Sequence, residues 1–516
     1  MKKTAIGVML ACFAATSNIT AQSPVQLTVN AATPGAVISR NIYGHFSEDL
    51  GHCIYDGFWV DPNLNVPKQG RIRMDVVNAL KKIKVPLLRW PGGCYADQYH
   101  WSDGIGDPAK RPKRLNTNWG MVLEDNSFGT HEFLQLCDLI GCEPYIAGNV
   151  GTGTPQEMQN WIEYLNYDGN STLAELRKQN GHEKPYKVSF WGVGNESWGC
   201  GGNMTPEFYA DQYKRYATYC INYPGAPLKK IASGSNGDDY NWTEVCMKNI
   251  HPWEMWGISM HYYTIATGNW GHKGSATQFN EDEYFHAMKN CLHIEDLVNR
   301  HSAIMDKYDP QKRVSLCVDE WGIWTDAEPG TNPAFLYQQN SMRDALIAAS
   351  TLNIFNNHAD RIRLASLAQT VNVLQSLILT NKEKMVLTPT YHVFDLYKVH
   401  QDATLLPVQF FSPEYGYGKE EIPAINASAS KDSSGTIHIS IVNIDAHKSI
   451  KINLALLGAD QKNINGQILT SAAFTDVNSF NNPNKVKPAA FTGFKAGSGD
   501  IEVNMPPISV VVLEIK

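Results

Sequence analysis

Between about residues 40 and 385, short apolar runs typical of β-strands alternate with segments of helical periodicity. A strand that is followed by a helix and then by another strand usually forms a parallel pair, so the alternation predicts βα units around a parallel sheet. There are eight such runs, which matches a closed (β/α)8 TIM barrel. The predicted strands are Ile42–Phe46, Pro86–Trp90, Glu143–Asn149, Lys187–Gly194, Lys230–Gly234, Gly257–His261, Val314–Asp319 and Ile362–Ala368.

After roughly residue 390 the pattern changes. The apolar runs become short and β-branched, Gly, Asn, Asp and Ser separate them, and helical periodicity is absent from the pattern. This is typical of an antiparallel β-sandwich. The run Val25–Val29 precedes the first barrel strand and is predicted to join that sandwich. We therefore expect an N-terminal strand segment (22–40), a (β/α)8 barrel (41–388) and a C-terminal β-sandwich domain (389–516).

The N-terminus has the composition of a secretory signal peptide. Lys2 and Lys3 precede an apolar run from Ala5 to Ala15, and small or polar residues follow as far as Ala21. This pattern predicts that residues 1–21 are removed and that the mature protein is exported, either to the periplasm or outside the cell. No later stretch is long and apolar enough to predict a membrane span.

Charge and cysteine spacing limit the partners. The net charge is −7 and no basic block is present, so we do not expect nucleic-acid binding. The cysteines show no zinc-binding spacing, and we expect neither a cofactor nor a metal. Cys94 and Cys200 lie in loops that should both face the same end of the barrel, so we predict a disulfide between them. Whether the protein forms a homo-oligomer is left open.

Two of the predicted strands each lead to a glutamate. Glu196 follows the run that begins at Val188, and Glu320 follows the run that begins at Val314. Two carboxylates on different strands of one barrel are the groups that glycosidic bond cleavage needs, one as acid/base and one as nucleophile. The alternative is structural, because a glutamate at a strand end can also cap the strand or pair with an arginine.

Polar residues also follow other predicted strands, and the carboxyl ends of the strands form the active site in barrels of this kind. Six of the eight strand ends carry such residues, which is difficult to explain by packing alone. These residues lie in Gly44–Asp49, Arg89–Cys94, Asn195–Glu196 and His261–Tyr263, and at Glu320 and Gln369.

At these motifs the sequence resembles glycoside hydrolase family 51, the α-L-arabinofuranosidases, over nearly the whole mature chain. The motifs are Tyr43–Glu48, Arg89–Gly93, Tyr99–Gly106, Gly194–Glu196 and Asp319–Trp321. The resemblance implies a catalytic barrel followed by a β-sandwich. It also implies retention of configuration, with Glu196 as acid/base and Glu320 as nucleophile.

The resemblance further implies how the sugar is held. Asn195 would bind its 2-hydroxyl, and Glu48, Arg89 and Gln369 would hold the other hydroxyls and the ring oxygen. For Arg89 and Glu48 the alternative is a salt bridge with each other, and both interpretations can hold together.

Three more residues complete the expected site. His261 and Tyr263 are placed to hydrogen-bond near the two carboxylates, with Tyr263 steadying Glu320. The stretch from Ile105 to Trp119 is predicted to be a long loop over the mouth of the barrel, where Trp119 would stack on sugar.

Two positions depart from the family pattern. Cys94 stands where the family commonly has Asn, which removes a donor and an acceptor near the furanose. Asp49 stands where the family usually has His. Both leave the catalytic pair intact and leave the exact substrate open.

We therefore expect a retaining, exo-acting α-L-arabinofuranosidase. Its substrates would be terminal arabinofuranosyl residues of arabinan, arabinoxylan or arabino-oligosaccharides. One alternative is an endo-β-glucanase or xylanase on a related barrel, and another is a non-catalytic carbohydrate-binding protein.

Overall fold

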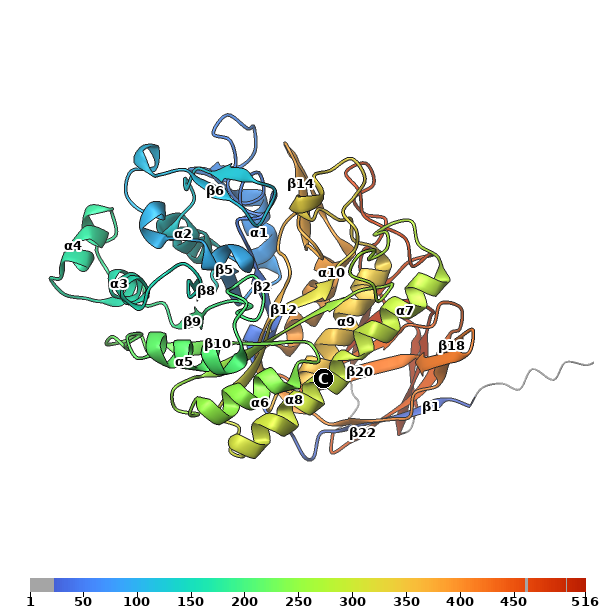
Figure 1. Cartoon of the computed structure of the whole chain (residues 1–516). Helices are drawn as coiled ribbons and strands as arrows, with labels where there is room; N and C mark the ends of the chain where they lie inside the picture. Colours follow the sequence, from blue (N-terminus) through green and yellow to red (C-terminus); the bar gives the residue numbers. More distant parts are fainter. Residues whose placement is uncertain (1–22, 460–462, 498) are drawn as a thin grey trace, which may run out of the picture.

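The computed structural model describes residues 23–459, 463–497 and 499–516, so the predicted signal peptide lies outside the described residues. Eight parallel strands close into a barrel, which confirms the predicted fold (Figure 1). Its strands in chain order are β2 (Gly44–Phe46), β5 (Leu87–Trp90), β8 (Glu143–Gly148), β9 (Phe190–Val193), β10 (Lys229–Asn236), β11 (Gly257–Thr264), β12 (Ser315–Ile323) and β13 (Ile362–Leu367).

Helices cover the outside of the barrel. Two of them begin with a clear local signal: Thr154 and Thr205 each accept a backbone hydrogen bond from the first turn of a helix that has proline at its first position. The helices are α1 (Met74–Lys82), α2 (Thr130–Ile140), α3 (Pro155–Asn166), α4 (Thr172–Gln179), α5 (Pro206–Ala217), α6 (Tyr240–Asn249), α7 (Glu281–Leu292), α8 (Ile294–Tyr308), α9 (Met342–Asn357) and α10 (Pro389–Tyr397).

The described part of the C-terminal region contains two large sheets. Within each sheet the neighbouring strands are antiparallel, except that β1 runs parallel to β22. One sheet has the order β17 (Val408–Gln409), β1 (Val25–Asn30), β22 (Ile450–Leu457), β26 (Asp500–Met505), β25 (Phe494–Ala496). The other has the order β16 (Thr404–Leu406), β20 (Ile425–Lys431), β21 (Ile437–Asn443), β27 (Ser509–Ile515), β23 (Ile464–Thr470), β24 (Ala489–Ala490).

Helix α9 joins the barrel to the second of these sheets. Every residue from Met342 to Asn356 is buried, as expected for a helix that has protein on all sides. Its polar residues are used in the contact: Asn356 accepts from the hydroxyl of Tyr43 in the barrel and donates to Ser428 of β20. The catalytic barrel and the C-terminal sheets therefore share one packed interface.

Two details differ from the sequence prediction. The segment after residue 389, where we predicted strands only, begins with helix α10. Strand β12 continues to Ile323, so Glu320 lies inside a strand rather than beyond its end. The remaining strands form small hairpins: β3–β4 (Lys68–Gln69, Ile72–Arg73), β6–β7 (Arg114–Asn116, Val122–Glu124), β14–β15 (Ile378–Asn381, Lys384–Leu387) and β18–β19 (Glu414–Tyr417, Glu420–Pro423).

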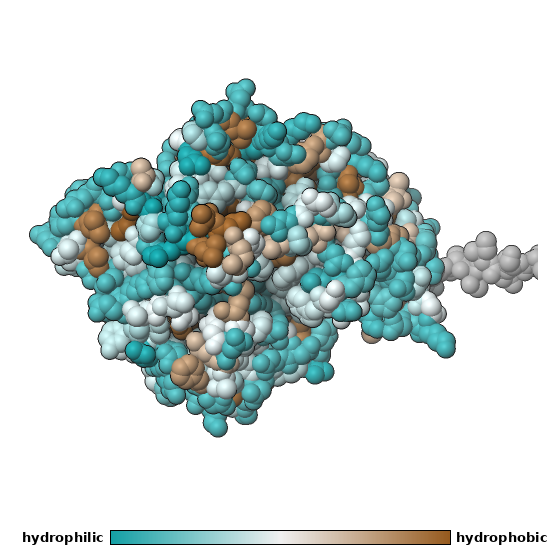
Figure 2. Space-filling view, turned by 45° about the horizontal axis from the view of Figure 1, so that its top comes forward, coloured by the Kyte–Doolittle hydropathy of each residue, from teal (hydrophilic) through white to brown (hydrophobic). Residues whose placement is uncertain are grey.

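The face of the molecule in Figure 2 is largely hydrophilic, and its hydrophobic areas are separate patches rather than one continuous band. Within the described residues, no helix has the length and apolar character needed to cross a bilayer.

Candidate active site

The two predicted catalytic carboxylates lie next to each other at the mouth of the barrel. One carboxylate oxygen of Glu196, one of Glu320 and one ring nitrogen of His261 all lie within 4.8 Å of one another. In a retaining glycosidase the two carboxyl groups stand about 5–5.5 Å apart. The separation therefore allows direct attack on a sugar held between them, with no room for an intervening water.

Glu320 lies on β12, where it is paired in register with His261 of β11. It is 5% exposed, and it accepts hydrogen bonds from Arg89 Nη1 and from the Tyr263 hydroxyl, both at 2.9 Å. Burial raises the pKa of Glu320 and the charge of Glu196 adds to this, while His261 and Arg89 oppose the shift. Two donors thus hold the ionised carboxylate in a fixed direction.

Glu196 follows β9, and its backbone φ is 40°, a left-handed value that is rare for a residue with a side chain. This conformation turns the side chain toward His261, whose Nδ1 lies 2.9 Å from a carboxylate oxygen. The other oxygen lies 3.4 Å from Cys200 Sγ. Cys94 and Cys200 form the predicted disulfide, with a Cα–Cα distance of 5.5 Å. The bridge therefore connects the loop after β5 to the segment that carries Glu196.

His261 lies between the carboxylates and is buried. Its Nδ1 faces Glu196, and its Nε2 lies 3.2 Å from Asp319 Oδ1. Burial alone would lower the pKa of His261, but the carboxylates of Glu320, Asp319 and Glu196 outweigh it and raise the pKa to about 10. At neutral pH the ring is an imidazolium, which donates from Nδ1 to Glu196 and forms an ion pair with Asp319 through Nε2.

Glu48 forms a second polar group beside the first. It accepts from Trp119 Nε1 at 2.8 Å, from Gln369 Nε2 at 3.0 Å and from the Tyr95 amide at 3.1 Å. Burial raises the pKa of Glu48 to about 7. A Cβ on Gly93 would stand 2.7 Å from Glu48 Oε2, so the turn after Pro91 requires glycine at this position.

Arg89 pairs with the catalytic side of the site rather than with Glu48. Besides Glu320, its guanidinium donates from Nη2 to Asn195 Oδ1 at 2.5 Å, and it lies 3.8 Å from Asp319. The salt bridge with Glu48 that we considered is thus replaced by a bridge between β5, β9 and β12. All nine predicted site residues lie in these two polar groups.

Two amide atoms in the site lack a partner among the described residues. Asn195 Nδ2 and Gln369 Oε1 are buried and make no hydrogen bond there. Because an unpaired buried polar group is costly, such atoms are expected where a polar ligand completes the bonding. Both side chains point their other atom into the network, which fixes their orientation.

The sequence analysis missed three buried residues that organise the site, namely Asp319, Tyr145 and Asp97. Asp319 accepts from the Tyr145 hydroxyl at 2.7 Å and faces His261 and Arg89. Burial alone would raise the pKa of Asp319, but Arg89 and His261 hold it below its ordinary value. Asp97 accepts from the amides of Val150, Gly151 and Asn195 at 2.7, 2.8 and 3.1 Å.

Only Asp319 had a sequence signal, since it immediately precedes Glu320. Neighbouring residues of a strand normally point to opposite faces. Here the register between β11 and β12 shifts between Ser259 and His261, so three residues of β12 span two of β11. This β-bulge lets Asp319 and Glu320 both face Arg89.

Among the residues that the structure describes, two clusters have ligand spacing for a metal ion, but their chemistry does not favour one. Glu196, His261 and Glu320 form one cluster, and a protonated imidazole has no lone pair to offer a metal. Cys94, Glu196 and Cys200 form the other, and its two sulfurs are joined in the disulfide.

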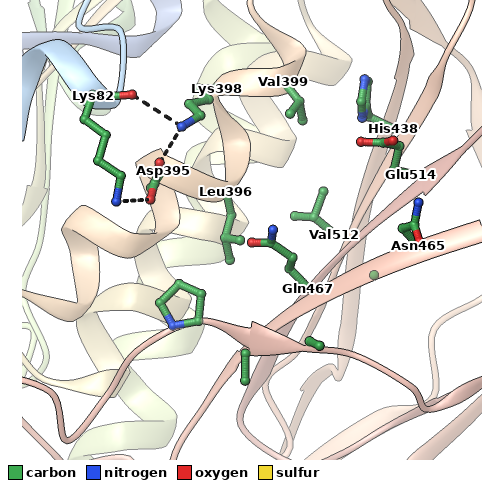
Figure 3. Close-up of a pocket in the computed structure, with 14 residues that line it drawn as sticks. Lys82, Asp395, Leu396, Lys398, Val399, His438, Asn465, Gln467, Val512 and Glu514 are labelled. Atoms are coloured by element: carbon green, nitrogen blue, oxygen red, sulfur yellow. Dashed lines mark hydrogen bonds and ion pairs between the residues drawn. The ribbon is translucent and has the colours of Figure 1, made fainter.

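A separate cavity of about 500 Å³ lies between the barrel helices and the C-terminal sheet (Figure 3). Its described lining residues include none of the nine predicted site residues. Asp395 pairs with both Lys82 and Lys398, so the charged groups at one side of the cavity are held in ion pairs with one another. The cavity therefore lacks the converging reactive groups of the barrel mouth.

A (β/α)8 barrel with two adjacent carboxylates at the carboxyl ends of its strands has the architecture of a glycoside hydrolase. Comparison with known proteins narrows this class to one family. Residues 79–284 match the family model "Alpha-L-arabinofuranosidase 1 domain", and residues 319–509 match "Alpha-L-arabinofuranosidase C-terminal domain".

Individual relatives agree. The chain is 51% identical over 515 residues, the full length of both chains, to the intracellular exo-α-L-arabinofuranosidase of Bacteroides ovatus. A crystal structure of the family 51 arabinofuranosidase from Xanthomonas axonopodis pv. citri matches with a TM-score of 0.94 and 48% identity, covering 95% of this chain and 100% of that one. The Thermotoga maritima α-L-arabinofuranosidase, solved as an arabinose complex, matches with a TM-score of 0.81 and 31% identity, covering 95% and 99%. The chain belongs to the α-L-arabinofuranosidases of glycoside hydrolase family 51.

The comparison corrects one prediction. We expected export after removal of a signal peptide, but the Bacteroides ovatus relative, which aligns over the whole chain, is named an intracellular enzyme. The prediction rested on a basic start and a short apolar run, and such a composition does not by itself establish that the segment is recognised and cleaved.

Proposed function

We propose that the protein is a retaining, exo-acting α-L-arabinofuranosidase that removes terminal arabinofuranosyl residues from arabinan, arabinoxylan or arabino-oligosaccharides. The observation that carries this proposal is the approach of the Glu196 and Glu320 carboxylates to within 4.8 Å, in a chain that belongs to family 51. Two carboxyl groups this close suit double displacement.

In the first step Glu320 attacks the anomeric carbon. The bond from that carbon to the leaving oxygen breaks, and Glu196 gives its proton to the leaving oxygen. Arg89 and Tyr263 support this role, because each donates a 2.9 Å hydrogen bond to Glu320 and so aims the nucleophile. The product of the step is a glycosyl ester on Glu320 and a free alcohol.

In the second step Glu196, now ionised, takes a proton from water as the water attacks the same carbon. The ester bond to Glu320 breaks and arabinose leaves with its original configuration. His261 supports both steps. Its positive charge lies 2.9 Å from Glu196 and 3.5 Å from Glu320, so it stabilises whichever carboxylate carries the negative charge.

The remaining predicted residues would hold the sugar. The unpaired Nδ2 of Asn195 suits the 2-hydroxyl, where hydrogen bonds strengthen in the transition state. Glu48 and Gln369 suit the other hydroxyls. Trp119, in the turn between β6 and β7, donates to Glu48 and so holds that hairpin against the site, which favours a pocket for a chain end over an open cleft.

The endo-glucanase or xylanase alternative is not favoured. A family 44 xyloglucanase from Paenibacillus polymyxa matches with a TM-score of 0.61 but only 11% identity, which supports a shared fold alone. Loss of catalysis is also not favoured, because both carboxylates and their donors are in place.

The test is a substrate panel whose products are followed by NMR. The enzyme should release single arabinose units, with retained configuration, from a nitrophenyl α-L-arabinofuranoside and from arabino-oligosaccharides, and should leave cellulose and unsubstituted xylan intact. Activity should survive exhaustive chelation. Inverted product, or internal cleavage of xylan, would refute the proposal.

A further inference from the structure

A row of aromatic rings leads from Glu320 to the outer surface. The hydroxyl of Tyr263 donates to Glu320 at 2.9 Å, the Trp324 ring stands edge-on to Tyr263 at 5.1 Å, and the Trp270 ring stands edge-on to Trp324 at 5.4 Å. Tyr263 belongs to β11, Trp270 lies in the loop that follows it, and Trp324 follows β12. The row therefore lies on the rim of the barrel mouth.

The outermost ring is exposed although its loop is well anchored. Trp270 is 55% exposed. The Lys273 ammonium lies 5.6 Å from the Trp270 ring centre and 5.3 Å from that of Trp324, and it donates to the Trp270 carbonyl at 2.7 Å. The amides of Lys273 and Gly274 both donate to the Asp326 carboxylate. The loop is thus tied to the segment after β12, and Trp270 is held in place while half uncovered.

A fixed, half-exposed indole beside a polar pocket suits one kind of ligand. Burying a large aromatic face stabilises a complex, and sugars present faces of C–H groups that pack on aromatic rings. The groups around Glu320 are polar and suit the sugar that is cleaved, whereas Trp270 lies two rings further out. A sugar at Trp270 is therefore a neighbour of the cleaved one, on the side of the leaving group.

We propose that Trp270, supported by Trp324, binds a sugar ring of the leaving group and so favours oligosaccharide and polysaccharide substrates over small arabinosides. This inference rests on the proposed function and adds a specificity-determining residue to it. Trp270 takes no part in bond breaking, because it touches Glu320 only through two other side chains.

A second exposed tryptophan offers a matched control. Trp253 is 73% exposed and stacks on His251, with ring centres 4.2 Å apart. It precedes β11 whereas Trp270 follows it, so the two lie toward opposite ends of the same strand. A general effect of losing a surface tryptophan should appear in both variants.

The test compares kcat/KM for nitrophenyl arabinofuranoside and for an arabinotriose in the wild type, Trp270→Ala, Trp270→Phe and Trp253→Ala. We expect Trp270→Ala to lose about tenfold on the trisaccharide and less than about twofold on the aryl substrate. Trp270→Phe should recover most of the loss, and Trp253→Ala should match the wild type. Equal loss on both substrates, or none on either, overturns the inference.

Binding without turnover provides a second measurement if Trp270→Ala folds poorly. In a Glu320→Ala background, Trp270→Leu, which keeps apolar bulk but has no aromatic face, should bind arabinotriose less tightly than the parent and bind free arabinose equally well; equal trisaccharide affinities overturn the inference. Failure of the wild type to cleave either substrate would instead refute the proposed function, so the two failures are distinguishable.

Discussion

Buried histidines have opposite pKa shifts at the mouth of the barrel and at its junction with the C-terminal sheets. His261 at the mouth and His400 at the junction are both buried. Three carboxylates raise the pKa of His261 to about 10. Burial, together with the nearby His438, lowers the pKa of His400 to about 3.

The difference lies in what each ring faces. His400 lies between two neutral hydroxyls, those of Ser430 at 2.7 Å and Ser440 at 2.6 Å. His261 lies between Glu196 and Asp319. Burial alone therefore does not decide whether a histidine carries charge. The mouth concentrates charges that chemistry needs, while the junction hydrogen-bonds neutral groups, which suits stability.

The largest effect on this charged group is expected from removing the Glu320 carboxylate, at the centre of the mouth. Glu320→Ala should lower kcat by roughly four orders of magnitude or more for every leaving group, because no covalent intermediate can form. The measurement is turnover of aryl and natural arabinosides, with the unfolding midpoint as the control for folding. Retention of a few per cent of activity on either substrate would contradict the role of nucleophile.

The second prediction tests whether Glu196 acts as the acid/base rather than as the nucleophile. Glu196→Ala should cost roughly 10²–10⁴-fold on natural arabinosides, whose leaving groups need a proton, and much less in the first step with an activated aryl leaving group. Azide, which needs no base, should restore turnover of the aryl substrate and yield a glycosyl azide. Full activity on natural arabinosides would falsify the assignment.

A smaller effect is expected from Asp97, which touches neither carboxylate. Asp97→Asn keeps an oxygen for Val150 and Gly151 but turns an NH2 group toward the Asn195 amide, so that hydrogen bond is lost. We expect a loss of about tenfold in kcat for natural arabinosides, and a smaller loss for activated aryl ones, because the segment carrying Glu196 moves. An equal loss for both substrates would indicate a general structural role.

The sequence predicts which residues lie at the mouth of the barrel better than it predicts which of them form pairs. All eight strands lie where their apolar runs predicted, and the rule that barrel sites form at carboxyl ends of strands was enough to gather the nine residues. The rule places strand ends, so it places Glu196, Arg89 and Gln369 at one rim. It says nothing of which side chains pair.

What the sequence did not predict depends on backbone irregularity and long-range contact. The bulge in β12 that turns Asp319 inward has no signature in an apolar run, and the role of Asp97 depends on three amides up to 98 positions away. Helix α10 was missed because it has only nine residues and is buried on nearly all sides, so its sequence lacks the separate polar face that marks an amphipathic helix. The two histidine environments also depend on partners that only the fold brings together.

The last prediction concerns stability, where the two histidines should differ in sign. For His400 the folded-state pKa of about 3 lies below the ordinary value of 6.5. Between those values the unfolded chain binds more protons, so the free energy of unfolding falls as pH drops below about 6.5. At pH 5 this group should cost roughly 2 kcal/mol relative to pH 7.5, a loss that His400→Gln should not show.

For His261 the folded pKa is raised, so its contribution to the free energy of unfolding is complete below pH 6.5 and is lost as pH rises toward 10. Urea unfolding of the wild type, His400→Gln and His261→Gln at pH 5, 7.5 and 9.5 separates the two. The same pH dependence in both variants would mean that burial, and not the facing groups, sets their charge.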